Sequence, residues 1–249
     1  MPLLPHLLRS TPMHSEAVIE QLFNLLVNGD RPAVRRFIGR VLLTGVSPDE
    51  FANDIVWPLH ETLFRLHRAD QIEPIAFQYS LRLLRTTIDQ LQAGYAQAPR
   101  RGREVLLFGG REEIEDLGGQ IASDLLEADG WEVRFGGPMV ALDELLAEVH
   151  ARKPAWLVLF SAHPKDVTTI REIIDTLKDI GGHPDLRIAV GGGVFNRARG
   201  LAEEMGASHS AASPKDLVEL LADRSRGEAR ERIAIRTAPE AVQRLRKSA

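Results

Sequence analysis

The chain has 249 residues, of which 31 are basic and 35 acidic, giving a formal net charge of −4, and 44% are hydrophobic. This composition excludes a disordered chain and suits one large or two modest globular domains. There is no cysteine, which excludes disulfides, thiolate metal sites and cysteine nucleophiles. The N-terminus lacks a long apolar region with a cleavage site, and no apolar run approaches the length of a membrane span, so we expect a cytoplasmic protein.

The first part of the chain is predicted to be helical, because apolar side chains recur there with the period of an amphipathic helix. Ser47-Pro48-Asp49-Glu50 is typical of a helix start, with proline and acidic residues in the first turn. Four helices with short connections predict an all-α bundle, which we assign to residues 13–97. The helices are expected over 15–29, 31–43, 47–67 and 73–95.

A polar stretch with Pro99 and Gly102 follows over 97–103, and it predicts a domain boundary. Beyond it, strands and helices alternate, which predicts an α/β domain over 103–223 with an open parallel sheet covered on both faces. The segment 131–135 alternates between apolar and polar residues, so we expect it nearer an edge. The strands are expected over 105–108, 131–135, 156–160, 187–190 and weakly near 207, and the helices over 112–128, 142–150, 165–179, 197–205 and 214–222.

The C-terminal tail over 224–249 has eight basic and three acidic residues, an excess of +5. A nucleic-acid or acidic partner would suit this charge, but a solvated, partly helical tail is the commoner interpretation.

Several catalytic motifs are absent. No phosphate-binding loop occurs, and Gly191-Gly192-Gly193 lacks the spacing of a dinucleotide-binding turn. Gly206-Ala207-Ser208-His209-Ser210 lacks the closing glycine of a nucleophile elbow. His60-Glu61 is followed by Phe64 where a zinc protease has its second histidine.

Three loops that follow predicted strands carry the residues of interest: 109–119, Ser161-Ala162-His163-Pro164 and 191–194. Open α/β sheets bind ligands at the carboxyl ends of their strands, and glycines there let a ligand approach the backbone. Tight turn packing explains any one loop, whereas three at one edge favour a ligand cleft.

Residues 15–222 resemble the cobalamin-binding domains of methionine synthase, corrinoid carrier proteins and B12-dependent light sensors, which join a four-helix cap to a flavodoxin-like (Rossmann) five-stranded sheet. The segment Trp57 to Ile72 is similar to the family's cap-helix segment. The resemblance implies that Ser161 and Gly191-Gly192 line the pocket for the nucleotide tail of cobalamin. It also makes Gly193, His163, Phe64 and Phe77 candidate cofactor contacts.

The family's D-x-H-x-x-G motif would fall on 113–118, where only Gly118 is retained. Glu115 occupies the position of the histidine that binds cobalt from below, and a carboxylate is a poor substitute for imidazole on cobalt. We therefore do not expect the methyl-transfer chemistry of the carriers. In the light-sensing relatives a Trp-His pair on this cap helix contacts the upper face of cobalamin, and the resemblance places His67 at or within one residue of that pair. His67, which shares a helix face with His60 and Phe64, is therefore the candidate axial ligand, and His163 is the runner-up.

The resemblance is greatest to the stand-alone regulatory branch, which includes the AerR/PpaA-type antirepressors and B12 photoreceptors. We therefore expect a sensor, responsive to light or to B12, that binds adenosyl-, methyl- or hydroxocobalamin. It is expected to act on transcription through a protein partner. We expect no enzyme activity, no membrane partner and no DNA-binding domain of its own, and a homo-oligomer is open.

The alternatives are a corrinoid carrier subunit of a methyltransferase, a haem sensor of the same fold and a scaffold without cofactor. In the cobalamin hypothesis a bulky residue at Gly192 should abolish binding, and His67→Ala should change the spectrum of the bound cofactor.

Overall fold

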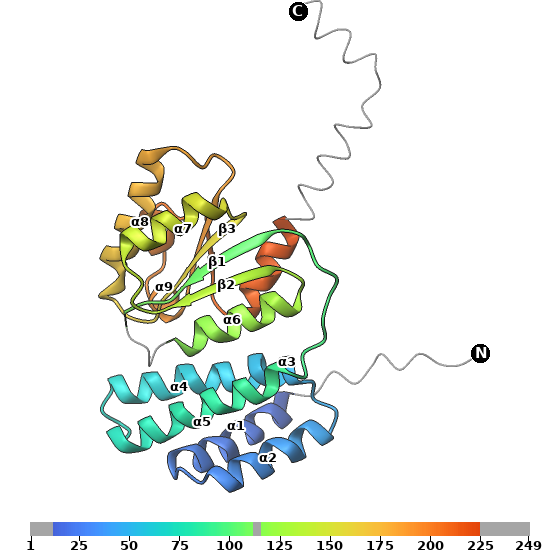
Figure 1. Cartoon of the computed structure of the whole chain (residues 1–249). Helices are drawn as coiled ribbons and strands as arrows, with labels where there is room; N and C mark the ends of the chain where they lie inside the picture. The colour runs from blue at the N-terminus through green and yellow to red at the C-terminus, as the bar shows by residue number, and fades with distance from the viewer. Residues whose placement is uncertain (1–11, 112–115, 225–249) are drawn as a thin grey trace, which may run out of the picture.

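The computed structural model describes residues 12–111 and 116–224. The helical part comes first and forms a layer against one side of the sheet domain (Figure 1). Asp30 caps the second helix by accepting a hydrogen bond from the backbone N–H of Ala33 at 3.0 Å, and Ser47 and Glu50 form a capping box at the start of the third. The elements are α1 (Pro12–Val27), α2 (Arg31–Leu43), α3 (Pro48–Phe51), η1 (Ala52–Val56), α4 (Trp57–Arg68) and α5 (Pro74–Gln92).

The expected third helix is continuous, because the residues that join α3, η1 and α4 keep right-handed helical dihedrals. Within it, η1 is a π-helical segment. Pro58 follows Trp57 in the first turn of α4, just beyond this segment. Proline has no N–H and its ring clashes with the carbonyl of the preceding turn, and a widened turn is one way for a helix to accommodate both effects.

The sheet has the strand order β2-β1-β3-β4-β5, and every neighbouring pair is parallel. Together with the helical cap, this is the flavodoxin-like α/β architecture predicted from the sequence. Strand β2 lies at an edge, as its alternating pattern predicted. The strands are β1 (Glu104–Phe108), β2 (Glu132–Gly137), β3 (Trp156–Phe160), β4 (Arg187–Gly191) and β5 (His209–Ala211).

Helices cover both faces of the sheet, and the expected helix over 197–205 is wrong. The chain forms two short helices instead, because Ala198 is extended and Gly200 has a left-handed φ of 80°, so neither continues the first helix. The helix expected from 112 begins at Leu117, and 112–115 lie outside the described residues. The helices are α6 (Leu117–Ala128), α7 (Leu142–Arg152), α8 (Asp166–Ile180), α9 (Gly193–Arg197), α10 (Leu201–Glu204) and a last helix over 214–224.

The two faces of the sheet belong to different apolar cores. Val105 and Leu107 join α6, the last helix and the whole cap in one cluster. Leu106 and Phe108 point the other way and pack with α7, α8 and α10. The cap is therefore an extension of one core of the sheet domain.

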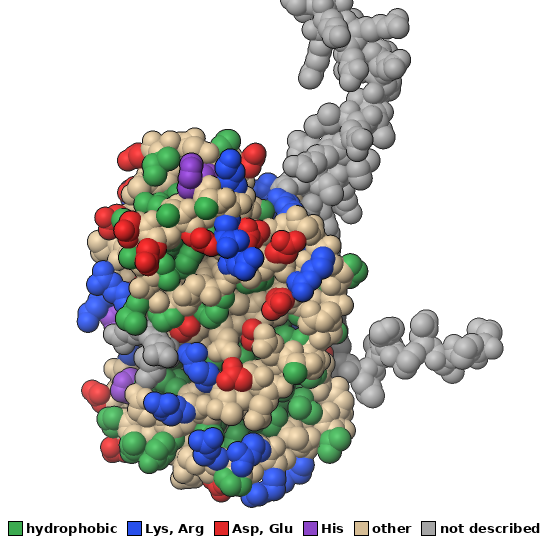
Figure 2. Space-filling view, in the orientation of Figure 1, with side chains coloured by type: hydrophobic (Ala, Val, Ile, Leu, Met, Phe, Trp, Pro, Cys, Tyr) green, Lys and Arg blue, Asp and Glu red, His purple; other side chains and the backbone are tan. Residues whose placement is uncertain are grey.

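Residues 93–103 connect α5 to β1 and are held against the end of α6. The backbone N–H groups of Ala98 and Arg101 donate to the carbonyls of Ala128 and Gly130, at 2.7 and 2.8 Å. We call this segment the connector. In the part of the chain that the structure describes, no helix has the length and apolarity that crossing a bilayer requires. Charged side chains of both signs are spread over the face shown in Figure 2.

Candidate functional site at the carboxyl edge of the sheet

The loops after β1, β3 and β4 meet at the carboxyl edge of the sheet. The neighbouring strands β1 and β3 have their following helices on opposite faces, which makes this the switch point where open α/β sheets bind ligands. Ser161 donates its backbone N–H to the carbonyl of Gly191 at 2.9 Å. On the other side, Met139 donates its N–H to the carbonyl of Gly110 at 3.0 Å.

Ser161 and Asp166 form a buried polar pair at the centre of this edge. The Ser161 hydroxyl donates to Asp166 Oδ2 at 2.5 Å and accepts the backbone N–H of His163 at 3.2 Å. Asp166 is 2% exposed, begins α8, and accepts the backbone N–H of Arg111 through Oδ1 at 3.2 Å. A carboxylate at a helix N-terminus is favoured by the helix dipole. Asp166 was not among the residues predicted from the sequence, although an acidic residue that begins a helix after the Ser161 loop was a usable signal.

Two positions in the loops require glycine, because a side chain there would clash with neighbouring atoms. Gly192 has a φ of 97°, and a Cβ built on it would lie 2.2 Å from the Ser161 carbonyl oxygen. A Cβ on Gly110 would lie 2.0 Å from Asp166 Oδ2. A side chain at Gly192 would therefore strike the Ser161 backbone before it filled any pocket, so the bulky Gly192 variant tests folding rather than cofactor binding.

The cap helix α4 packs on this edge through Trp57 and Glu61. The Trp57 ring meets Phe160, the last residue of β3, edge-on at a centroid distance of 6.0 Å. A Cβ on Gly118 would lie 2.8 Å from Trp57 and 2.7 Å from Phe160, so only glycine fits between them. One turn further along α4, a Cβ on Gly193 would lie 3.3 Å from a Glu61 carboxylate oxygen.

The charge of Glu61 is balanced across the boundary between cap and sheet. Burial raises the pKa of Glu61, and the positive charges of Arg197 and then Arg68 oppose that rise. Arg197 also donates to the carbonyl of Ala162 at 2.6 Å, which fixes α9 to the loop after β3.

His60 is the buried imidazole of the site. It is 1% exposed, and neither ring nitrogen has a hydrogen-bond partner among the described residues. Trp57 stacks on it at a centroid distance of 5.4 Å and an angle of 21°, and the Phe64 ring contacts it at 4.7 Å with a tilt of 52°. Burial, followed by the charges of Arg68 and Arg85, lowers the pKa of His60 to about 3, so the ring is neutral near pH 7.

The histidine chosen from the sequence lies further along the same aromatic row. The half-buried His67 ring stacks on Phe77 of α5 at 4.0 Å and 10°, and Phe77 meets Phe64 edge-on at 5.1 Å. Phe64 and Phe77 thus separate His67 from His60 and from Trp57 at the sheet edge.

The other predicted residues are placed as follows. His163 is half-buried in the loop after β3, and its Nδ1 accepts the backbone N–H of Lys165 at 3.0 Å. Gly191, Gly192 and Gly193 lie beside Ser161 and α4, as described above. Glu115 lies outside the described residues. Among the residues described, no group of three or more His, Asp or Glu side chains is arranged to hold a metal ion by itself.

Known proteins are similar to this chain in sequence over the sheet domain and in fold over most of its length. Residues 105–214 match the family model of the B12 binding domain. The monomethylamine corrinoid protein of Methanosarcina barkeri has a similar structure, with a TM-score of 0.72 at 14% sequence identity over 83% of this chain and 98% of that chain. The sequence matches no curated protein.

Two further solved structures are similar at lower TM-scores. A cobalamin-binding protein of Desulfitobacterium hafniense DCB-2 has a TM-score of 0.46 at 17% identity, over 82% of this chain and 97% of that one. The methanol:cobalamin methyltransferase complex of Methanosarcina barkeri has a TM-score of 0.47 at 19% identity, over 88% of this chain and 86% of that one.

Proposed function

We propose that the protein binds a cobalamin at the carboxyl edge of the sheet beneath α4 and acts as a sensor that regulates transcription through a protein partner. The match of residues 105–214 to the B12 binding domain carries the cofactor assignment, because that segment contains all three loops of the site. The partner and its genes are expectations from the sequence resemblance.

The residues present fit this cofactor. A neutral, buried imidazole whose nitrogens form no hydrogen bond with the described residues is a suitable ligand for cobalt, and His60 has these properties at the boundary between cap and sheet. The Glu61 carboxylate lies 3.8 Å from His60 Nδ1. Ser161 and the glycines beside it would receive the nucleotide tail. Bound cobalamin would supply a cobalt ion with an exchangeable axial position, which can register the form of the cofactor or its illumination.

A sensory role is favoured over a carrier role by Glu115, which stands where the carriers have the lower histidine. The corrinoid carrier subunit is nevertheless the second candidate, because the corrinoid protein of Methanosarcina barkeri shares this architecture over 98% of its length. For the sensor we expect no methyl-transfer activity of its own.

The first experiment is an absorption spectrum of the purified protein after incubation in the dark with adenosyl-, methyl- or hydroxocobalamin and removal of free cofactor. Retention of one corrinoid per chain is expected. A spectrum that changes on illumination indicates a light sensor, and an unchanged one indicates a sensor of B12 itself. A protein that retains no corrinoid contradicts the proposal. If that protein gives the spectrum of a bound haem when haem is added, the haem sensor replaces the cobalamin sensor.

Histidine variants then identify the axial ligand. His60→Ala is expected to shift the spectrum of bound hydroxocobalamin toward that of the free cofactor, while exposed His150→Ala leaves it unchanged. His67→Ala and His163→Ala test the two residues chosen from the sequence. If all these variants keep the spectrum of the native protein, none of these histidines binds cobalt.

The choice between sensor and carrier rests on two further measurements. Limited proteolysis of the loaded protein, kept dark or illuminated, is expected to give different cleavage patterns if the cap responds to the cofactor. The loaded protein, reduced and given methylamine or methanol methyltransferases, should transfer no methyl group. Methyl transfer with an unchanged cleavage pattern would establish the carrier.

A further inference from the structure

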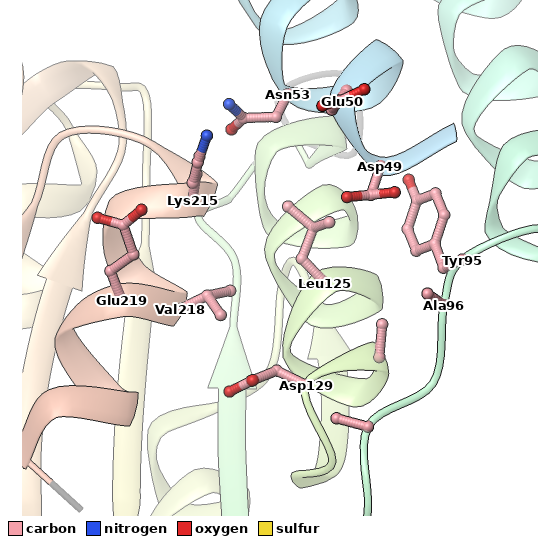
Figure 3. A pocket seen from close by; sticks show the side chains of 12 residues that line it. Asp49, Glu50, Asn53, Tyr95, Ala96, Leu125, Asp129, Lys215, Val218 and Glu219 are labelled. Atoms are coloured by element: carbon pink, nitrogen blue, oxygen red, sulfur yellow. The ribbon is translucent and has the colours of Figure 1, made fainter. Parts of the chain in front are cut away.

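A second cavity, remote from the carboxyl edge, lies where the cap, the connector and the sheet domain meet. Its volume is about 310 Å³, at the lower end of the range for small-molecule sites. Figure 3 shows that its lining comes from α3, the connector, α6 and the helix over 214–224. Its lining includes Asp49, Tyr95, Leu125, Asp129, Lys215 and Glu219.

The lining is acidic. Asp49, Glu50, Asp129 and Glu219 face one basic residue, Lys215. Asp129 is already paired with Arg101 at 2.6 Å, and Glu50 caps α3. Within the described residues, the side chains of Asp49 and Glu219 form neither a hydrogen bond nor an ion pair, which leaves negative charge available to a ligand.

Tyr95 provides an independent sign of a missing ligand. It is 5% exposed and lines the cavity, yet its hydroxyl has no hydrogen-bond partner among the described residues. Figure 3 shows the phenol end of Tyr95 directed toward the Asp49 carboxylate. Leaving a buried polar group unpaired costs free energy, and a donor placed between the Tyr95 hydroxyl and the Asp49 carboxylate would remove that cost.

The kind of donor follows from the chemistry of the lining. Three or more carboxylates arranged to hold a metal ion are absent from the described part of the chain, so a bare metal ion does not fit. The acceptors are accompanied by an apolar wall made of Leu125, Val218 and three alanines, Ala96, Ala98 and Ala128. A charged head with an attached carbon chain satisfies both parts of the cavity.

We propose that this cavity binds a small organic cation, a primary ammonium or guanidinium group on a short apolar body, with the charged group held by Asp49 and the Tyr95 hydroxyl. The ligand would touch the cap through α3 and the sheet domain through α6 and the last helix. It would therefore bridge the two halves of the molecule independently of the cobalamin site.

The test is isothermal titration calorimetry of the full-length protein, without cobalamin, against putrescine, agmatine and arginine. Butanol and glutarate are the neutral and anionic controls. We expect one saturable site for at least one of the cations and none for the controls. Absence of saturable binding by all three cations, or equal binding of glutarate, overturns the proposal.

Variants place the binding in the cavity. Asp49→Asn and Tyr95→Phe should each weaken binding by about tenfold or more, since the first removes the negative charge that faces the cation and the second removes the hydroxyl that accepts from it. Asp143→Asn, at the same place in the first turn of α7, and Tyr79→Phe, on the surface of α5, are the matched controls and should bind as the native protein does. Thermal unfolding of every variant checks the fold. Undiminished binding by folded Asp49→Asn and Tyr95→Phe proteins overturns the assignment.

Discussion

At the scale of single residues, the burial of His60 makes the stability of the protein depend on pH. Its pKa is about 3 in the folded protein against 6.5 when exposed, so the unfolded chain takes up a proton that the folded protein refuses. The contribution of His60 to stability is complete above pH 6.5 and is lost as the pH falls toward 3. Between pH 7.5 and 5.5 this amounts to about 1.4 kcal/mol.

Urea unfolding at the two pH values measures this effect. The native protein should lose about 1.4 kcal/mol more than His60→Leu, which has no proton to gain. His150→Leu, which alters an exposed histidine, should lose as much as the native protein does. Equal losses in the native and His60→Leu proteins would mean that His60 is hydrated in the folded state.

Removing the Ser161 hydroxyl should lower the free energy of unfolding more than the loss of one oxygen atom suggests. Ser161→Ala leaves a buried carboxylate oxygen of Asp166 without its donor, and we expect a loss of about 1–3 kcal/mol in the free energy of unfolding. Ser80→Ala is the control, because this equally buried hydroxyl only adds a second bond to a carbonyl inside helix α5. Similar losses in the two variants would contradict the special role of the pair.

Alanine substitutions at Gly192 and Gly45 distinguish the cost of backbone strain from the cost of a steric clash. Both have a φ near 97°, but a Cβ on Gly45 meets nothing within 4 Å, whereas one on Gly192 meets the Ser161 backbone. Alanine at Gly45 should cost about 1–2 kcal/mol for its left-handed conformation. Alanine at Gly192 should cost about 1–3 kcal/mol more, from overpacking, as measured by urea unfolding. Equal costs would show that the loop can shift to accommodate a side chain.

At the scale of elements, the contact between α5 and α6 contains a carboxyl with the opposite pH dependence. Burial, then the charges of Glu127 and Asp89, raises the pKa of Asp124 from 3.8 to about 7. The folded protein therefore holds a proton that the unfolded chain releases above pH 3.8, and stability falls as the pH rises from about 4 to 7.

Asp124→Asn removes this penalty while keeping an acceptor for Gln92, whose side chain donates to Asp124 Oδ1 at 2.9 Å. We expect the variant to be more stable than the native protein at pH 8, by about 1–3 kcal/mol, with a smaller difference at pH 5. Urea unfolding at both pH values checks this, with Asp143→Asn as the control. A variant that is less stable at pH 8 would show that the charged carboxylate is compensated.

The order of elements was predictable because it depends on local periodicity. The buried strand 156–160 has the predicted bounds, and the edge position of β2 followed from its alternation. The break after Arg197 was missed because Gly200 permits a left-handed turn without requiring one. His67 was chosen because the resemblance places it near the Trp-His pair of the light-sensing relatives, whereas the burial of His60 beside Trp57 depends on packing that the helix period alone does not give. Asp166 was missed because its bond from the Arg111 backbone joins distant segments of the chain, and Tyr95 was missed because only the folded chain buries its hydroxyl.

At the scale of the whole molecule, a cofactor beneath α4 would join two parts that otherwise meet through Trp57, Glu61 and the α5–α6 contact. A ligand that binds only the folded state stabilises it by about 2.7 kcal/mol at a concentration 100 times its Kd. For a chain of this size that raises the unfolding midpoint by about 5–10 °C. Because the cap and the sheet share one apolar core, the rise should appear as a shift of a single transition.

Calorimetry of the Trp57→Ala protein tests this coupling. Removal of a buried tryptophan should cost about 3–5 kcal/mol and, since the ring lies between α4 and Phe160, should separate cap unfolding from sheet unfolding into two transitions. The exposed Leu43→Ala change should leave one transition. Hydroxocobalamin should restore a single transition in Trp57→Ala only if the cofactor contacts both parts. If it shifts the sheet transition alone, the cofactor rests on the loops of the sheet and α4 does not take part in holding it.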